Sequence, residues 1–186
     1  MVTSVLALFR KNMRNEFDFY PTPVSIITAL LDNLQWDNSV IWEPCAGDGR
    51  VVDMIKERGH IAIGTDIQTG NDFFEYEKTI APCIITNPPF KPIRNFIDHA
   101  FEIGVERMAL VCPERLWACK KGREQFSRYR PSRFINMDWR EDYLGKGGKP
   151  DRALAVAIWD KPENESTNYE IWSKPCLFYT SDAADE

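Results

Sequence analysis

The sequence predicts an α/β domain with a mostly parallel sheet and helices on both faces. Short apolar runs alternate along the chain with longer segments in which apolar residues recur at helical spacing. This alternation is typical of parallel sheets, in which helices connect successive strands. The length of 186 residues and the hydrophobic content of 44% suit one globular domain with a sizeable core.

The first part of the chain predicts two helices and two strands. Residues 24–34 carry aliphatic side chains at helical spacing after a Thr-Pro pair, which predicts a helix. The apolar runs at 39–44 and 61–66 predict strands, and 50–58 predicts the helix between them. The segment 72–80 predicts a weak strand or a loop.

The middle of the chain continues this alternation. Residues 83–86 and 108–112 are apolar runs and predict strands. Between them, 91–103 predicts a helix because its apolar side chains recur on one face. A further helix is predicted over 123–129, where it stops before Pro131.

Two more apolar runs complete the predicted domain. Residues 134–139 and 153–159 predict strands, joined by a loop with a glycine-rich and lysine-containing stretch at 145–150. The segment 161–186 is predicted to be a C-terminal tail, disordered or artefactual. Its end, 179–186, resembles translated sequencing-adapter read-through, and an acidic disordered tail is the alternative.

The string Asn87-Pro88-Pro89-Phe90 follows the apolar run at 83–86. The Asn87 amide oxygen and the Pro88 carbonyl are acceptors that suit an amino group on a planar ring. The prolines fix φ and remove N–H donors, so the turn is stiff, and Phe90 offers a flat face for stacking. The four residues are therefore catalytic candidates, and a proline-rich turn with a buried phenylalanine is the alternative.

A turn of small residues follows the predicted strand at 39–44. Gly47 and Gly49 allow the backbone to turn tightly and to approach a ligand closely. The carboxyl ends of parallel strands are where open α/β sheets bind ligands. The third glycine of a G-x-G-x-x-G fingerprint is absent, so an ordinary strand–turn–helix loop is the alternative. The candidate binding residues are Glu43, Pro44, Cys45, Ala46, Gly47 and Gly49.

One acidic residue ends the second predicted strand, and another follows it. Asp66 closes that strand about twenty residues after the glycine turn, the spacing at which a carboxylate reaches the ribose of a bound nucleoside. Asp72 and Phe73 suit an adenine amino group and an adenine ring. A helix cap and a turn with core aromatic residues are the alternatives.

In this order, the segments resemble class I S-adenosylmethionine-dependent methyltransferases that act on amino groups, in particular phage and bacterial DNA adenine-N6 methyltransferases. Residues 87–90 match the family form (D/N/S)-P-P-(Y/F/W), and the motif order is the gamma arrangement. The resemblance covers 17–160 and leaves 1–16 as an N-terminal extension. It implies a single Rossmann-like domain whose mostly parallel seven-stranded sheet ends in an antiparallel edge strand.

The resemblance also implies S-adenosyl-L-methionine as the cofactor. Residues 43–49 would bind its methionine end, Asp66 its ribose, and Asp72 with Phe73 its adenine. The segment before the first helix would close over the methionine end. Its residues are Tyr20, Thr22 and Pro23.

The resemblance implies methyl transfer to adenine N6 in DNA. Three alternatives remain open: an RNA adenine-N6 methyltransferase, a protein glutamine-N5 methyltransferase, and a non-catalytic subunit that binds the cofactor. A separate target-recognition domain is not expected, so the enzyme would be loosely specific, would read the target sequence with the region 113–150, or would rely on a partner.

Charge is unevenly distributed along the chain. The net charge is −5, but residues 105–152 hold 12 basic and 7 acidic side chains. Within that block, aromatic residues are interleaved with basic ones, which is typical of a phosphate-binding face. A solvated helix surface is the alternative, and Lys146 and Lys149 could add contacts. The candidate nucleic-acid-binding residues are Arg115, Lys120, Lys121, Arg123, Arg128 and Arg130.

The five cysteines are odd in number and form no C-x-x-C pair. This pattern predicts reduced thiols, without a metal site or a disulfide framework. No apolar run approaches transmembrane length, and the N-terminal segment is a poor signal peptide. We therefore expect a cytoplasmic protein without membrane contact, in a bacterium or a phage-infected cell.

Overall fold

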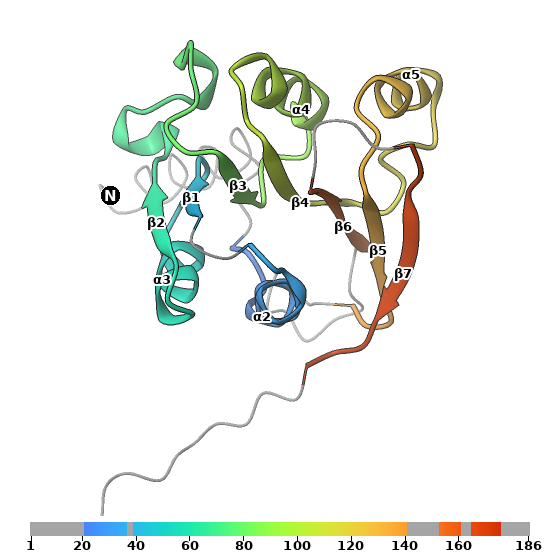
Figure 1. Cartoon of the computed structure of the whole chain (residues 1–186), viewed down its shortest axis with the longest axis horizontal. Helices are drawn as coiled ribbons and strands as arrows, with labels where there is room; N and C mark the ends of the chain where they lie inside the picture. The colour runs from blue at the N-terminus through green and yellow to red at the C-terminus, as the bar shows by residue number, and fades with distance from the viewer. Residues whose placement is uncertain (1–20, 37–38, 141–152, 161–164, 176–186) are drawn as a thin grey trace, which may run out of the picture.

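The computed structural model describes residues 21–36, 39–140, 153–160 and 165–175. Within them, the chain forms a seven-stranded sheet in the order β2-β1-β3-β4-β6-β5-β7 (Figure 1). The strands are β1 Val40–Glu43, β2 Ile61–Gly64, β3 Cys83–Thr86, β4 Arg107–Pro113, β5 Arg133–Met137, β6 Leu154–Trp159 and β7 Asn168–Trp172. The helices are α2 Val24–Asn33, α3 Arg50–Glu57, α4 Ile93–Glu102 and α5 Lys120–Arg128, with two short 3-10 helices, η1 Ile67–Thr69 and η2 Phe73–Glu75.

The sheet is mostly parallel, as predicted. Strands β2, β1, β3 and β4 pair in parallel, and β5 pairs in parallel with β7. Strand β6 lies between β4 and β5 and is antiparallel to both. Helices α2 and α3 cover one face, and α4 and α5 cover the other (Figure 1).

The antiparallel strand is internal, which corrects the prediction of an antiparallel edge. All six residues of β6 are buried, because the strand has a neighbour on each side and helices over both faces. The edge next to β5 is instead β7, within 161–186, where the sequence predicts no strand. Three of its five residues are exposed, so β7 lacks the apolar run that identifies the other strands.

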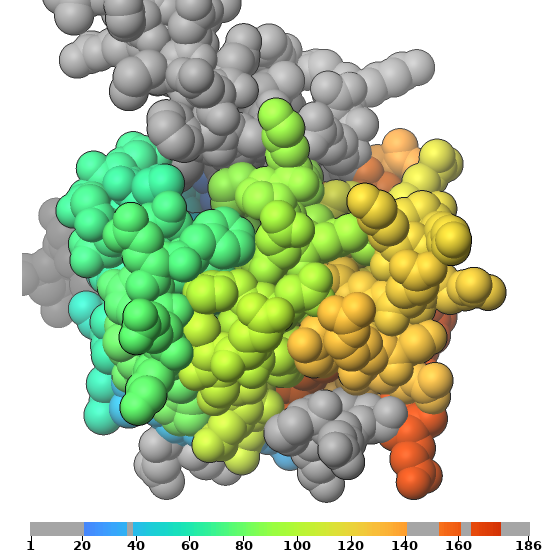
Figure 2. Space-filling view, turned by 90° about the horizontal axis from the view of Figure 1, so that it is seen from above, coloured from blue at the N-terminus to red at the C-terminus, as the bar shows by residue number. Residues whose placement is uncertain are grey.

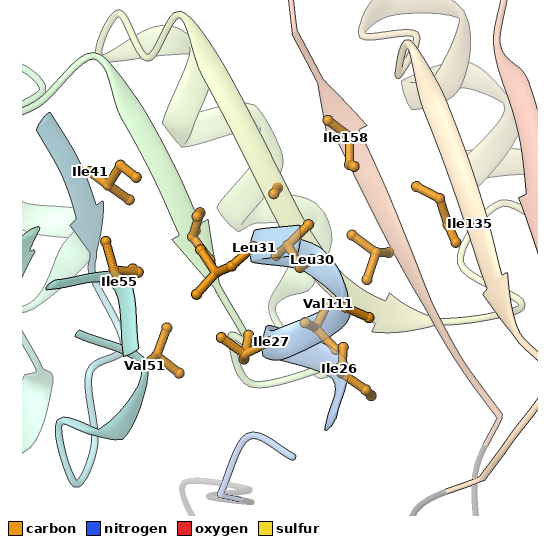
Figure 3. Close-up of a cluster of buried hydrophobic side chains, with 14 of the residues drawn as sticks. Ile26, Ile27, Leu30, Leu31, Ile41, Val51, Ile55, Val111, Ile135 and Ile158 are labelled. Carbon is orange, nitrogen blue, oxygen red and sulfur yellow. The ribbon is translucent and has the colours of Figure 1, made fainter. Parts of the chain in front are cut away.

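Strand β4 shows how one apolar run serves two cores. Its side chains alternate in direction, so Ala109 and Val111 pack with α2 and α3. Met108 and Leu110 point the other way and pack with α4. Figure 3 shows the first core, in which aliphatic side chains of α2 and α3 meet those of the strands. A strand buried on both faces reads as a continuous apolar run, which is why the sequence identifies it.

Most predicted elements differ from the observed ones by at most two residues at an end, but two predictions differ more. Helix α5 begins at Lys120, three residues before the predicted start, because Cys119 Sγ accepts a hydrogen bond from the Gly122 N–H (3.3 Å) at its first turn. The predicted weak strand or loop at 72–80 contains η2 and no strand.

The order of the strands creates a crevice between β1 and β3. From β1 the chain crosses to β2 on one side, and it then returns to β3 on the other side of β1. The loops after β1 and β3 therefore leave the same edge of the sheet in different directions. Open α/β sheets bind ligands at such a switch point.

Candidate active site

A cleft of about 770 Å³ opens at this switch point. Its walls come from segments far apart in the sequence, residues 21–22, 44–48, 66–68, 72–74 and 87–92, together with the first turns of α3 and α4. Small-molecule sites commonly have volumes of roughly 300–1,000 Å³. The cleft is therefore large enough for a nucleoside-sized ligand.

Backbone conformation shapes the loop after β1. Gly47 and Gly49 have φ values of 54° and 84°, in the left-handed region that glycine adopts without strain. The Ala46 N–H donates to the Thr65 carbonyl at 2.9 Å, which ties this loop to the end of β2. Residues 44–47 line the cleft, so small side chains leave the backbone close to a ligand.

Glu43 ends β1 with its carboxyl group inside the protein, where the residue is 1% exposed. Its Oε1 accepts hydrogen bonds from the Cys45 N–H (2.9 Å) and the Thr86 hydroxyl (2.5 Å). Its Oε2 is buried and has no hydrogen-bond partner among the described residues. Burial raises the pKa of Glu43 to about 8, although the two hydrogen bonds oppose this rise. The carboxyl group is therefore mostly protonated at neutral pH.

Asp66 lines the cleft from the loop after β2, just before η1. Its Oδ2 accepts from the Gly47 N–H and its Oδ1 from the Gln68 N–H, both at 2.8 Å. The first bond joins the loops that follow β1 and β2. Each carboxylate oxygen has a further lone pair, so Asp66 can also accept a ligand hydroxyl.

Asp72 and Phe73 lie at the start of η2, which packs against α4 on one side of the cleft. Asp72 accepts from the Phe74 N–H at 3.0 Å and so caps η2. The Phe73 ring stacks on Phe96, with centroids 4.0 Å apart and planes at 18°. His99 Nε2 lies 3.0 Å from the Phe73 carbonyl oxygen. These contacts fix the position of η2 against the helix.

Residues 87–90 leave the carboxyl end of β3 and all line the cleft. Pro88 is buried, and Phe90 packs against both hydrophobic cores. The two prolines restrict the backbone of this wall. The turn is thus a rigid part of the cleft and lies beside the loop after β1.

The cleft brings together most of the predicted catalytic and cofactor-binding residues. Those that line it are Thr22, Pro44, Cys45, Ala46, Gly47, Asp66, Asp72, Phe73, Asn87, Pro88, Pro89 and Phe90. Three others do not line it: Glu43 is buried beneath the loop, Gly49 turns the chain into α3, and the Pro23 carbonyl accepts the first N–H groups of α2. Tyr20 lies outside the described residues.

Helix α4 contributes cleft residues that the sequence does not identify. Asn95 and Phe96 line the cleft, as does Lys91 just before the helix. Phe96 reads in the sequence only as part of an apolar helix face. Their place in the chain could have identified Asn95 and Phe96. The helix that contains them begins soon after residues 87–90, so its first turns lie at the same edge of the sheet.

The predicted nucleic-acid-binding residues have three different placements. Three of them line a second cleft, between α4 and α5: Arg115, Lys121 and Arg128. Lys120 and Arg123 are exposed on α5 and do not line this cleft. Arg130 donates to the Glu165 carbonyl, so its guanidinium contacts the segment before β7. Only the first three of these residues therefore share one cleft.

Some predictions fall outside the described residues: the extension 1–16, Lys146 and Lys149, and the chain end 179–186. Among the residues with described positions, no three or more His, Cys, Asp and Glu side chains group as metal ligands would. No helix in the same part of the chain has the length and apolar character needed to cross a membrane.

Several solved structures with a similar fold are described as methyltransferases or as modification subunits of restriction enzymes. A Listeria monocytogenes protein, assigned to the class I S-adenosylmethionine-dependent methyltransferases, has a TM-score of 0.57 and 11% identity, covering 85% of this chain and 66% of that protein. A Vibrio vulnificus protein, assigned as a modification subunit of a type I restriction enzyme, has a TM-score of 0.56 and 13% identity. The match covers 92% of this chain and 51% of that protein. A Pyrococcus horikoshii protein, assigned as an RNA methyltransferase, has a TM-score of 0.51 and 18% identity. The match covers 79% of this chain and 88% of that protein.

No protein-family model matches the sequence, and no curated protein matches it. The chain spans 66% of the Listeria protein and about half of the Vibrio protein. At 11–18% identity these likenesses concern the fold. The chain has the Rossmann-like fold of class I methyltransferases.

Proposed function

We propose that this protein transfers a methyl group from S-adenosylmethionine to N6 of adenine in DNA. One observation carries the proposal: a single cleft at the switch point is lined by the glycine turn, by Asp66, by Phe73 and by residues 87–90. A cofactor loop and an amine-binding turn would thus face the same space. The fold shared with class I methyltransferases supports this assignment.

The residues of the cleft fit the cofactor. Residues 44–47 present a backbone with little side-chain bulk, which suits its amino-acid end. Asp66 has lone pairs left for ribose hydroxyls, and Asp72 with Phe73 suits an adenine amino group and ring. When bound, the cofactor supplies a methyl group that a sulfonium centre has already activated for attack.

The charges of the cleft suit a cationic ligand. Asp48, Asp66 and Asp72 line it, and the basic lining residues are Arg50 and Lys91. Arg50 is paired with Asp48 at 2.6 Å, which leaves two acidic side chains and one lysine. This excess of negative charge favours a sulfonium and an ammonium group.

The turn after β3 suits the amino group that receives the methyl. Asn87 Oδ1 and the Pro88 carbonyl would accept hydrogen bonds from the amine hydrogens. Such bonds draw the nitrogen lone pair out of conjugation and stabilise the positive charge that develops on nitrogen. Phe90 would stack on a base flipped out of the duplex. Water can take the displaced proton after attack, so positioning and charge stabilisation suffice.

Basic residues beside the cleft favour a nucleic acid over a protein substrate. Arg115, Lys121 and Arg128 line the second cleft, which shares Phe90 with the first. Phosphate groups provide the negative charge that such residues bind. DNA is the form of nucleic acid that the resemblance of residues 87–90 to the DNA adenine-N6 methyltransferases favours.

The test is transfer of radiolabelled methyl to three separate pools: unmethylated DNA, total RNA and a protein extract, each followed by nucleoside or amino-acid analysis. The expected product is N6-methyladenine in the DNA pool. The Asn87→Ala variant, purified in the same way, measures the background from contaminating enzymes. Label in RNA or protein alone would overturn the DNA assignment. No label in any pool, with calorimetry showing bound cofactor, would overturn methyl transfer by this chain.

A further inference from the structure

A second cleft, of about 550 Å³, lies beside the active-site cleft between α4 and α5. Phe90, Lys91 and Asn95 line both clefts. Figure 2 looks onto this face of the molecule, where the yellow-green surface of α4 lies beside the gold surface of α5. A ligand bound across Phe90 would therefore contact both clefts.

Positive side chains dominate the second cleft. The basic residues that line it are Lys91, Arg94, Arg115, Lys121 and Arg128, and the acidic ones are Asp98 and Glu124. Within the described part of the chain, the side chains of Lys91, Arg115 and Lys121 form no ion pair. The whole chain has a net charge of −5, so this cleft is a local positive region on an acidic protein.

Hydrogen bonds hold the walls of the second cleft in place. Gln125 is 5% exposed, and its Nε2 donates to the Arg94 carbonyl (2.7 Å) and to Asp98 Oδ1 (2.9 Å). The Arg94 guanidinium donates to the Leu116 carbonyl and to Cys119 Sγ. These bonds join α4, α5 and the loop after β4. The width of the cleft is thus set before a ligand binds, which lowers the entropic cost of binding.

We propose that the second cleft binds the phosphodiester backbone next to the nucleotide whose base enters the active-site cleft. Arg115 and Lys121 are the main phosphate contacts, and Gln125 and Arg94 are positioning residues. This assignment rests on the proposed function, because it takes the ligand of the first cleft to be a nucleotide of a strand.

The geometry of base flipping requires such a site. A flipped base carries its sugar and phosphates with it, so the flanking phosphates lie at the mouth of the pocket that receives the base. Contacts to phosphates fix the position of the strand without reading its sequence. Among the described residues, Lys91, Arg115 and Lys121 form no ion pair in the second cleft, and hydrogen bonds join its walls. Phe90 lines both clefts and so marks the boundary between them. It can therefore hold the strand while residues 87–90 hold the base.

The test is a walk of single neutral phosphates along a DNA strand. The probe is a single-stranded oligonucleotide with one adenine among thymines, in which one phosphate at a time is replaced by an uncharged methylphosphonate. For the wild-type protein, neutralising a phosphate adjacent to the adenine should weaken binding about tenfold. In the Arg115→Ala/Lys121→Ala variant the same replacement should hardly weaken binding further, because the side chains that contact this phosphate have been removed.

Lys56→Ala is the matched control. Lys56 is exposed on α3, which covers the opposite face of the sheet, so this variant should keep the wild-type pattern. The phosphate site is overturned if the Arg115→Ala/Lys121→Ala variant keeps the wild-type response at every position. It is also overturned if no phosphate near the adenine affects binding. The same walk on an RNA strand separates the two sources of phosphate: coupling seen with RNA alone would keep the site and reassign the strand.

Methyl transfer to the same oligonucleotides separates this proposal from the proposed function. Coupling here means that neutralising a phosphate weakens binding in the wild-type protein but not in the Arg115→Ala/Lys121→Ala variant. Methyl transfer to the adenine without this coupling would overturn the phosphate site alone. Coupling without transfer, in the presence of bound cofactor, would overturn the methyltransferase assignment alone.

Discussion

Glu43 is an acid whose environment opposes its charge. It is buried at the end of β1, and its hydrogen bonds from Cys45 and Thr86 reach only one of its two carboxyl oxygens. Its pKa is about 8 in the folded protein, against an ordinary value of 4.5. The unfolded chain therefore loses this proton at a lower pH than the folded protein, and folding stability falls as the pH rises from about 4.5 to about 8.

Replacing Glu43 with glutamine should remove this pH dependence, because an amide of similar shape does not ionise. The stability of Glu43→Gln relative to wild type should increase by about 4 kcal/mol between about pH 5 and about pH 8. Urea unfolding at several pH values measures the difference. A difference that stays constant over this range would show that Glu43 is ionised in the folded protein.

Asn87 is the residue on which the proposed chemistry depends most. Asn87→Ala removes an acceptor for the amine hydrogens and should lower turnover about 100-fold or more, since the lost bond stabilises developing charge. Cofactor affinity should remain near the wild-type value, because the cofactor-binding candidates lie in other segments. Steady-state methyl transfer and calorimetry measure the two quantities.

Asn87→Asp is the conservative control for that experiment. It keeps a side-chain oxygen at the same position and should retain more activity than Asn87→Ala. Wild-type turnover in Asn87→Ala would remove this side chain from the mechanism.

Among the elements, α4 and α5 are coupled through one buried amide. Gln125 Nε2 bonds to two acceptors on α4, the Arg94 carbonyl and Asp98 Oδ1. Gln125→Leu would leave both acceptors without this donor in a largely buried place. We expect a loss of about 2 kcal/mol in the free energy of unfolding.

Ser127→Ala provides the comparison on the same helix. Ser127 bonds to the Arg123 carbonyl at an exposed position, so its loss should change stability by less than about 0.5 kcal/mol. Urea unfolding of both variants tests the difference. Equal stability of Gln125→Leu and Ser127→Ala would show that the amide does not couple the helices.

At the scale of the whole molecule, β7 extends the domain beyond residue 160. It pairs with β5 along five residues, and Arg133 forms two hydrogen bonds to Glu170, at 2.7 and 2.8 Å. Trp172 is 9% exposed and packs in the core that also contains α2. A domain ending at 160 therefore lacks a structural strand.

A chain that ends after Asp160 should be less stable by at least about 3 kcal/mol, the scale of losing one buried tryptophan. Ile171→Ser in the full chain is the control, because Ile171 is 65% exposed and its replacement should change stability little. Thermal and urea unfolding of the two proteins make the comparison. An unchanged midpoint in the shortened chain would show that β7 contributes nothing to the fold.

Local features of the fold could be predicted from the sequence because they depend on neighbouring residues. Apolar runs identify β1 to β4 and β6, and glycine and proline identify the turns at 44–49 and 87–90. The family resemblance implies that both turns serve one reaction, and residues of both line the active-site cleft. The spacing of aliphatic side chains likewise identifies α2.

The tertiary structure decided the features that depend on residues far apart in the chain. The position of β6 inside the sheet follows from its pairing with both β4 and β5. The polar strand β7 forms because β5 offers an open edge and Arg133 offers a partner for Glu170. Phe96 at the active-site cleft, the high pKa of Glu43 and the second cleft arise in the same way. Each of these features depends on burial and on contacts between distant residues. A local pattern in the sequence contains information about neither.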